Sequence, residues 1–238
     1  VRKNMGDLPS ALEDINHAIR LSPENAAAYV YRAQVLRNMR QYHEAIRDYD
    51  TSLKLKKNQG WAFCNRGLSH FLLGNYPQAE ADYLQAVKLG YRNTWIYNRL
   101  GDLYIRLGDA PEALKWLAQA KKENPAGDEA YFASALAYLL LQDDGAHRQN
   151  LDLAIQKAEL QVGKPSWDIR SQFHLALYYL AKGDLETALA RYRRVLVQNP
   201  PSFLILEAKD DLQEVFRLDP HLQGRQAVLD LLQTDRKG

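Results

Sequence analysis

The chain has a single cysteine among its 238 residues, and this scarcity excludes several kinds of site at once. One thiol cannot form an internal disulfide, and no pair of cysteines is present for a structural zinc site. Long apolar runs are also missing, because the most hydrophobic stretch, residues 131–141, is too short to cross a bilayer. We therefore predict no membrane span in this sequence, and the low cysteine content favours a reducing, cytoplasmic location.

The chain has neither a large excess of charge of one sign nor a recognisable catalytic motif. The sequence has 31 Lys and Arg residues against 29 Asp and Glu residues, a balance too even to favour nucleic-acid binding. None of the six histidines has the His-Glu-x-x-His spacing of zinc hydrolases, and no glycine-rich loop could cradle a phosphate. Cys64 and His70 lean to different faces of one predicted helix, so we interpret Cys64 as an apolar filler. The sequence thus predicts no enzyme: no catalytic residue, no metal site and no cofactor.

What the sequence does contain is a repeat of 34 residues, in successive periods that begin at Ala26, Gly60, Thr94 and Asp128. A recurrence of this length is typical of stacked helix–turn–helix units that cannot bury their apolar faces alone. Position 4 of the period is aromatic (Tyr29, Phe63, Tyr97, Tyr131), position 8 is small (Ala33, Gly67, Gly101, Ala135), position 20 is alanine (Ala45, Ala79, Ala113) and position 24 is large (Tyr49, Tyr83, Leu117).

Each period predicts two helices joined by a turn at position 15. Gly74 and Gly108 suit a left-handed conformation there, and Arg40 replaces the glycine in one period. Small side chains at positions 8 and 20 allow the two helices to approach closely, and the large residue at position 24 fills the remaining space. We expect the aromatic residues at position 4 to be largely buried.

This pattern resembles the tetratricopeptide repeat family over residues 1–201. The resemblance implies an all-α, right-handed superhelical solenoid of antiparallel helix pairs, with about five to six repeats. Gly6 already stands at position 15, so the first repeat is truncated and Val1–Met5 would be the tail of its first helix. We interpret the chain as a piece of something longer. In residues 202–238 the repeat pattern is missing, and Ser202–Arg217 and His221–Gln233 are predicted as capping helices before a short tail.

The fifth period departs from the pattern. His147 stands where the alanine of position 20 is expected, Ala154 lies seven residues later, and Ala188 follows Ala154 by 34 residues. We place the surplus residues in Gln142–Asn150, a polar stretch, as an insertion that lengthens the turn between the two helices. This turn is predicted to be exposed.

In the family that the chain resembles, the first helix of each repeat lines a concave groove, and positions 2, 5, 9, 12 and 13 project into it. The resemblance implies a protein–protein interaction scaffold that binds a peptide or protein segment in this groove. We expect aromatic residues to supply contact area there and polar residues to orient the segment. The candidate groove residues, at and beside these positions, are Trp61, Asn65, Phe71, Trp95, Asn98, Arg99, Asp102 and Phe132.

Chaperone-binding members of the family clasp a C-terminal carboxylate, and this use can be compared residue by residue. Asn65 and Arg99 match two of the five clamp positions, whereas Val30, Gln34 and Trp95 stand at the other three. No lysine is present among them to neutralise a carboxylate pair, so the sequence gives little support to such a clamp.

Two further alternatives stay open. The chain could be a sensing or regulatory module of a larger signalling protein. An RNA-binding repeat protein would need a basic inner face, and the arginines at the groove positions, Arg37, Arg106 and Arg170, are offset by Asp102 and Glu129. The sequence identifies neither the partner nor the oligomeric state.

Overall fold

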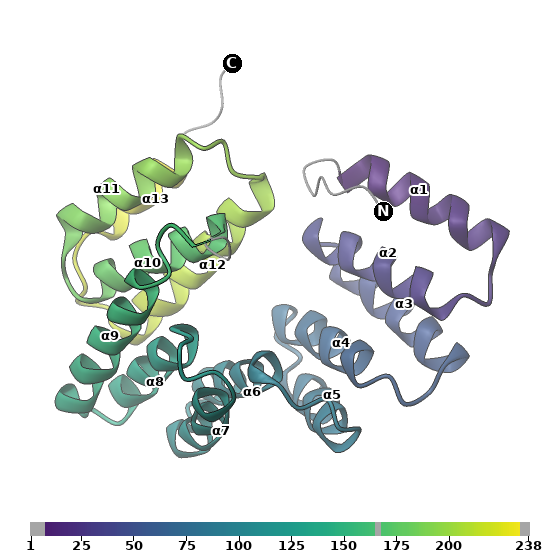
Figure 1. The fold of residues 1–238 in the computed structure, drawn as a ribbon, viewed down its shortest axis with the longest axis horizontal. Coiled ribbons are helices and arrows are strands. Elements are labelled where there is room, and N and C mark those ends of the chain that lie inside the picture. The colour runs from purple at the N-terminus through teal and green to yellow at the C-terminus, as the bar shows by residue number, and fades with distance from the viewer. Residues whose placement is uncertain (1–7, 165–167, 234–238) are drawn as a thin grey trace. The chain divides into compact units, whose positions relative to one another are not determined.

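The computed structural model describes residues 8–164 and 168–233. Every regular element within these ranges is an α-helix, thirteen in all, so the predicted all-α fold is confirmed (Figure 1). None of the helices in the described part of the chain is both long and apolar enough to cross a membrane. The predicted helix tail Val1–Met5 lies outside the described residues.

The chain divides into two compact units, residues 1–107 and 108–238. The helices of the N-terminal unit are α1 (Leu8–Leu21), α2 (Ala26–Asn38), α3 (Tyr42–Leu55), α4 (Gly60–Leu72), α5 (Tyr76–Lys88) and α6 (Thr94–Leu107). Those of the C-terminal unit are α7 (Ala110–Glu123), α8 (Glu129–Leu140), α9 (Asp144–Glu159), α10 (Ile169–Ala181), α11 (Leu185–Leu196), α12 (Ser202–Leu218) and α13 (Arg225–Gln233).

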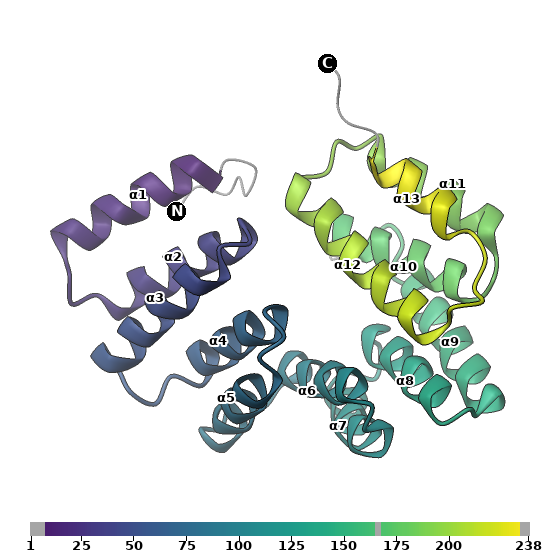
Figure 2. The ribbon, with the colours of Figure 1, turned by 180° about the vertical axis from the view of Figure 1, so that it is seen from behind.

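Within each unit the helices pack in the order of the sequence. In the N-terminal unit α2 pairs with α3 and α4 with α5, and each pair packs against the next helix along the chain. In the C-terminal unit α8 pairs with α9 and α10 with α11. The two predicted C-terminal helices are present: α12 packs against α10 and also contacts α8, and α13 packs against α11 and α12 (Figure 2). Of the two, α13 begins four residues later than predicted.

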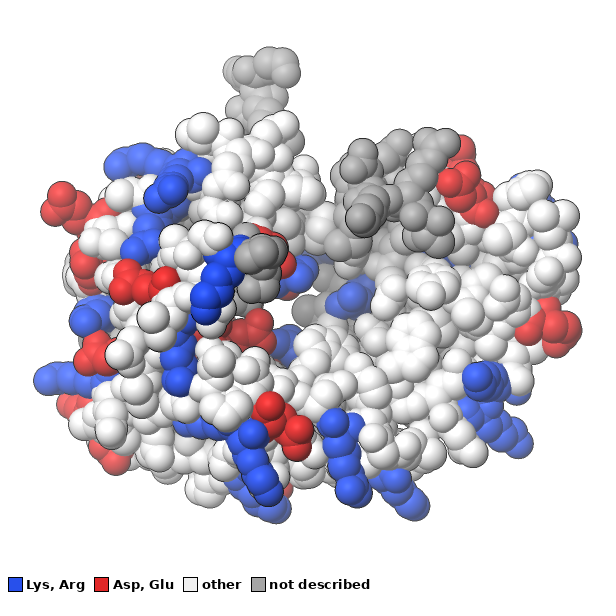
Figure 3. Space-filling view, viewed as in Figure 1, with Lys and Arg blue, Asp and Glu red and all other residues white. Residues whose placement is uncertain are grey.

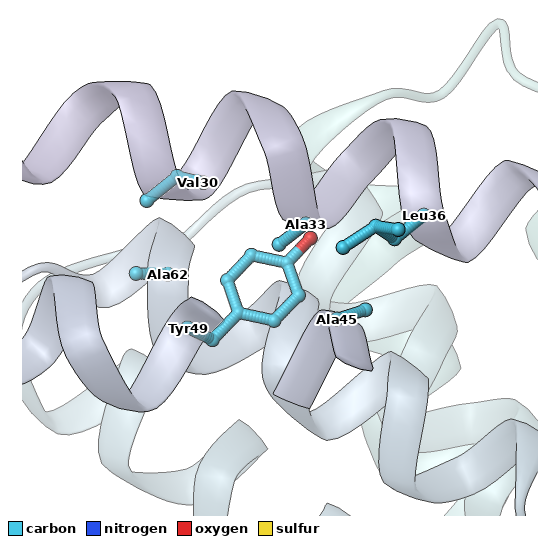
Figure 4. Packing of buried hydrophobic residues seen from close by; sticks show 6 residues of the cluster. All are labelled: Val30, Ala33, Leu36, Ala45, Tyr49 and Ala62. Carbon is cyan, nitrogen blue, oxygen red and sulfur yellow. The ribbon is translucent and has the colours of Figure 1, made fainter. Parts of the chain in front are cut away.

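The helix pair α2–α3 shows how small and large residues build the core. Ala33 on α2 and Ala45 on α3 are both fully buried, and their small side chains leave room for the ring of Tyr49, which is also fully buried (Figure 4). Ala62 of α4 closes the cluster from the next repeat. Tyr83 occupies the same place in the α4–α5 pair, where a Cβ on Gly67 would lie 2.8 Å from its ring. The predicted roles of positions 8, 20 and 24 are confirmed in these pairs.

Within residues 8–164 and 168–233 the turns at position 15 adopt a left-handed backbone, although only some of them contain glycine. Gly74, Gly108 and Gly183 have φ values of 78°, 79° and 86°, and Arg40 and Gln142 have 61° and 57° at the corresponding places. Residues with a Cβ adopt this conformation at a cost of about 1–2 kcal/mol. The turn geometry is therefore imposed by the packing of the helices on either side, and glycine only makes it easier.

The prediction of a lengthened turn at Gln142–Asn150 is wrong. The turn after α8 contains only Leu141 to Asp143, and α9 starts at Asp144, where the Asp143 carboxylate accepts a hydrogen bond from the N–H of Ala146. Leu151 and Ala154 are buried at the places of positions 24 and 27, so the 34-residue register continues through α9. The surplus residues therefore follow Ala154, in the longer α9 and in the connection to α10.

The prediction that the aromatic residues of position 4 are largely buried is confirmed for Tyr97, which is 6% exposed, and holds only in part for the others. The remaining three, Tyr29, Phe63 and Tyr131, are half-buried. A cationic side chain lies over each of these three rings: the guanidinium of Arg66, for example, lies 5.3 Å from the centroid of Phe63.

The same arginine joins neighbouring repeats. Arg66 on α4 donates two hydrogen bonds to the carboxylate of Asp82 on α5, at 2.9 and 2.6 Å, and a third to Asp50 on α3. The Asp82 side chain is only 6% exposed, and its negative charge is compensated by this bidentate partner. The equivalent residues one repeat earlier are Arg32, Asp48 and Asn16.

We predict that Arg66→Met lowers the free energy of unfolding by about 3 kcal/mol, because it leaves the nearly buried Asp82 carboxylate without its cation. Arg47→Met is a matched control, since Arg47 pairs with Glu44 on the exposed surface of α3 and its loss should cost less than about 1 kcal/mol. Urea unfolding followed by circular dichroism measures both. Equal losses in the two variants would mean that the inter-repeat arginine stabilises no more than a surface ion pair does.

Candidate functional site

The predicted groove face of the N-terminal unit is formed by α2, α4 and α6, and α4 contacts both of its neighbours. Its residues divide into two sets. Val30, Cys64 and Leu68 are buried and belong to the core. The set that stays partly exposed comprises Gln34, Arg37, Asn38, Trp61, Phe71, Trp95, Asp102 and Arg106. Five of the fifteen positions that the family resemblance assigns to the groove on these helices are therefore buried: Val30, Cys64, Leu68, Asn98 and Ile105.

Trp61 and Trp95 stand at position 2 of α4 and α6, and both are half-buried. Trp61 lies at the edge of the α2–α3 core, where it packs against the cluster that contains Val30 and Ala62. A tryptophan anchored in this way presents a ring of fixed position, which costs little conformational entropy on binding. Both rings retain exposed surface.

Phe71 on α4 supplies a third half-buried ring. Its centroid lies 5.7 Å from that of Tyr76 on α5 and 5.8 Å from the guanidinium of Arg106 on α6. The ring is thus held between an aromatic and a cationic neighbour from two other helices. This arrangement fixes the ring where α4 faces α6.

The polar candidates are less available than the sequence suggests. Asn65 is 6% exposed, and its amide nitrogen donates to the carbonyl oxygen of Trp61 at 2.8 Å. Asn98 is only 2% exposed. Arg99 and Asp102, one turn apart on α6, form an ion pair at 3.1 Å and keep about a third of each side chain exposed. Of the four polar candidates, Arg99 and Asp102 are the two that keep polar groups at the surface.

Phe132 is placed differently from the other aromatic candidates. It lies on α8 in the C-terminal unit, is 9% exposed and stacks on Tyr178 of α10 with centroids 4.4 Å apart. The hydroxyl of Tyr178 in turn donates to Asp128 at 2.8 Å. Phe132 is therefore part of the packing between α8 and α10, and it has little surface to offer a ligand.

One aromatic residue was not among the predicted candidates. Tyr31 on α2 is 47% exposed and stands at position 6, the position of Asn65 and Arg99 in the next two repeats. The spacing of 34 residues would have placed it beside the other candidates. It was missed because the family pattern assigns positions 2 and 5, rather than 6, to apolar groove contacts.

The three helices of this face carry more basic than acidic side chains. Helices α2, α4 and α6 contain one acidic residue, Asp102. Arg32 and Arg66 are bonded to aspartates of α3 and α5, whereas Arg37 and Arg106 lie among the predicted groove positions. Elsewhere basic and acidic side chains are interspersed over the surface, as Figure 3 shows for one face.

The described residues contain no candidate metal centre, and the single thiol is buried. No group of three or more His, Cys, Asp and Glu side chains within residues 8–164 and 168–233 could hold a metal ion. Cys64 is fully buried, and burial raises the pKa of its thiol well above the ordinary value. A thiol in this state is a packing residue, in agreement with its interpretation as an apolar filler.

Three stretches of the chain match models of the tetratricopeptide repeat: residues 15–47, 64–128 and 170–202. Together they include more than half of the 238 residues. The matched stretches contain the small residues Ala33, Ala45 and Gly67, the large residue Tyr83, and the turns at Arg40, Gly74, Gly108 and Gly183. No curated protein sequence matches the chain.

Solved structures share the fold. TTC0263, a thermophilic TPR protein of Thermus thermophilus, is 22% identical, with a TM-score of 0.61 over 79% of this chain and 99% of that one. PilF of Pseudomonas aeruginosa is 17% identical, with a TM-score of 0.58 over 87% and 90% of the two chains. YrrB, a TPR protein with an unusual peptide-binding site, is 20% identical, with a TM-score of 0.51 over 92% and 100%. Identities this low show a common fold and leave function open.

We predict that Cys64 reacts with Ellman's reagent at least about 100-fold more slowly in the native protein than in denaturant, because its thiol is buried and protonated. Absorbance of the released thiolate measures the rate as urea is raised. The rate should increase together with the loss of helical signal. Rapid labelling of the native protein would contradict the placement of Cys64 in the core.

Proposed function

This chain belongs to the tetratricopeptide repeat family, and from that premise we propose that it is an interaction scaffold whose N-terminal unit binds an extended segment of a protein partner. The contact surface comprises the exposed parts of Trp61, Phe71 and Trp95. The role is one of binding, without a catalytic step.

The observation that carries the proposal is the pair of half-buried tryptophans at the same position of adjacent helices. Apolar surface that leaves water contributes about 25 cal/mol per Å², and large rigid rings provide much of it at interfaces. Trp61 and Trp95 come from repeats that follow each other, so a segment laid across α4 and α6 would meet one ring after the other. Phe71, further along α4, extends the same surface.

Fewer polar residues are available to orient the bound segment than the sequence predicts. Asn65 uses an amide hydrogen within its own helix, so we assign it to holding the backbone of α4 around Trp61. Arg99 and Asp102 keep exposed hydrogen-bonding groups of both signs one turn apart. An extended peptide offers both N–H donors and carbonyl acceptors, and such a pair can bond to each.

A protein of similar fold supports a binding role. YrrB is a TPR protein with a peptide-binding site, and its whole length matches this chain in structure. The likeness lies in the fold.

A library of random linear peptides tests the proposal without knowledge of the natural partner. Phage that bind the immobilised wild-type protein are counter-selected on the Trp95→Ala variant, and the survivors are synthesised with a fluorescent label. Anisotropy titration then gives each Kd. If no peptide prefers the wild-type protein to the variant, the proposed surface is wrong.

We predict that Trp95→Ala weakens binding of such peptides at least about tenfold, because a buried aromatic anchor contributes about 2 kcal/mol or more. Trp61→Leu should also weaken binding while it keeps the apolar contact with the α2–α3 core. Leu84→Ala is the matched control: Leu84 is an apolar side chain on α5, 39% exposed and outside the proposed surface, so its Kd should change less than about twofold. Thermal melting confirms that each variant is folded.

We further predict that raising NaCl from about 0.1 to 0.5 M changes these affinities less than about threefold, because apolar burial is not screened by salt. The same anisotropy titration provides the measurement. Binding that survives in Trp95→Ala but falls steeply with salt would assign recognition to charged residues instead.

A further inference from the structure

Tyr131, the aromatic residue at position 4 of the fifth repeat, is approached by two ammonium groups. Nζ of Lys121 on α7 lies 4.6 Å from the ring centroid, and Nζ of Lys157 on α9 lies 4.7 Å from it. Three successive helices of the C-terminal unit thus bring two positive charges to one ring. Cation–π attraction accounts for part of this arrangement.

In the third repeat, carboxylates accompany the cation that lies over the aromatic ring of position 4. There the guanidinium over the ring of Phe63 belongs to Arg66, and the carboxylates of Asp82 and Asp50 both bond to it. One positive charge is balanced by two negative ones at the corresponding ring.

The fifth repeat has a neutral residue in place of the carboxylate. Asn150 stands at position 23, the position of Asp48 and Asp82 in the second and third repeats. Its side-chain oxygen accepts a hydrogen bond from Lys121 at 3.0 Å. Its amide nitrogen donates to the carbonyl oxygen of Ala146 at 2.9 Å, which fixes the orientation of the amide. The site keeps the hydrogen-bond acceptor and lacks its charge.

Neither lysine forms an ion pair with any carboxylate in residues 8–164 and 168–233. Lys157 donates to the carbonyl oxygen of Pro125, which is again a neutral acceptor. Burial lowers the pKa of Lys121 to about 8, as expected for an amine that loses water without gaining a counter-charge. A partly buried cation of this kind costs free energy unless an anion joins it.

We propose that Lys121 and Lys157, with Asn150 and Tyr131 beside them, form a binding site for an oxyanion, either a phosphate or a carboxylate group of a ligand. The oxyanion supplies the negative charge that Asp82 and Asp50 supply at Arg66. Each ammonium has three donors and uses one of them on a neutral oxygen, so donors remain for the anion. The site shares no residue with the proposed peptide-binding surface and does not depend on it.

The variant Asn150→Asp tests this directly, because it places a carboxylate where the second and third repeats have one. It should raise the melting temperature in phosphate-free buffer and raise the pKa of Lys121, read from the lysine side-chain carbons by NMR. Gln149→Glu adds the same charge to an exposed neighbouring position on α9 and is the matched control. It should leave the Lys121 pKa nearly unchanged.

Ligand binding is measured with inorganic phosphate and with acetate, each against NaCl at the same ionic strength. In the wild-type protein we expect a saturable shift of the Lys121 signals, with an apparent Kd at least about tenfold weaker in Asn150→Asp. Saturation by phosphate alone identifies a phosphate ligand, and saturation by both probes identifies any carboxylate or phosphate group. Equal shifts in wild type and Asn150→Asp, or none with either probe, would overturn the proposal.

Discussion

Close approach of the two helices within each repeat is the constraint on which the rest of this structure depends. Tyr49 and Tyr83 are fully buried because the residues opposite them have almost no side chain, as with Ala33 and Gly67. With the helices this close, the turn between them must be short and left-handed, whatever residue occupies it. The faces that remain exposed, and hence the residues available to a ligand, follow from this packing.

The sequence predicted the helix pairs because their small and large residues recur at a single spacing, and it misplaced the surplus residues for a physical reason. Seven residues make about two turns of an α-helix, so a shift by seven returns each side chain to nearly the same face. Ala154 therefore resembled position 20, although it occupies position 27. The 34-residue count from Leu117 at position 24, which leads to the buried Leu151, would have resolved this ambiguity.

The positions of the candidate residues along their helices were predictable, and their exposure only in part. Helical periodicity shows which positions share a face, so Trp61 and Trp95 are where the sequence placed them. It does not show which side chains a neighbouring helix will cover. Phe132 lies under Tyr178, a residue of the next repeat, and Asn65 bonds within its own helix. The first outcome depends on a contact between two periods, and the second on a hydrogen bond within α4 that helical periodicity does not predict.

Helix α12 gives the C-terminal unit a property that simple repeat proteins lack. In an ideal array each repeat interacts only with its neighbours, and the ends fray independently. Because α12 contacts both α10 and α8, its loss removes a neighbour from two repeats at once. The repeats of this unit should therefore unfold together rather than in sequence from the end. During synthesis, α8 must also wait for residues 202–218 to emerge before its packing is complete.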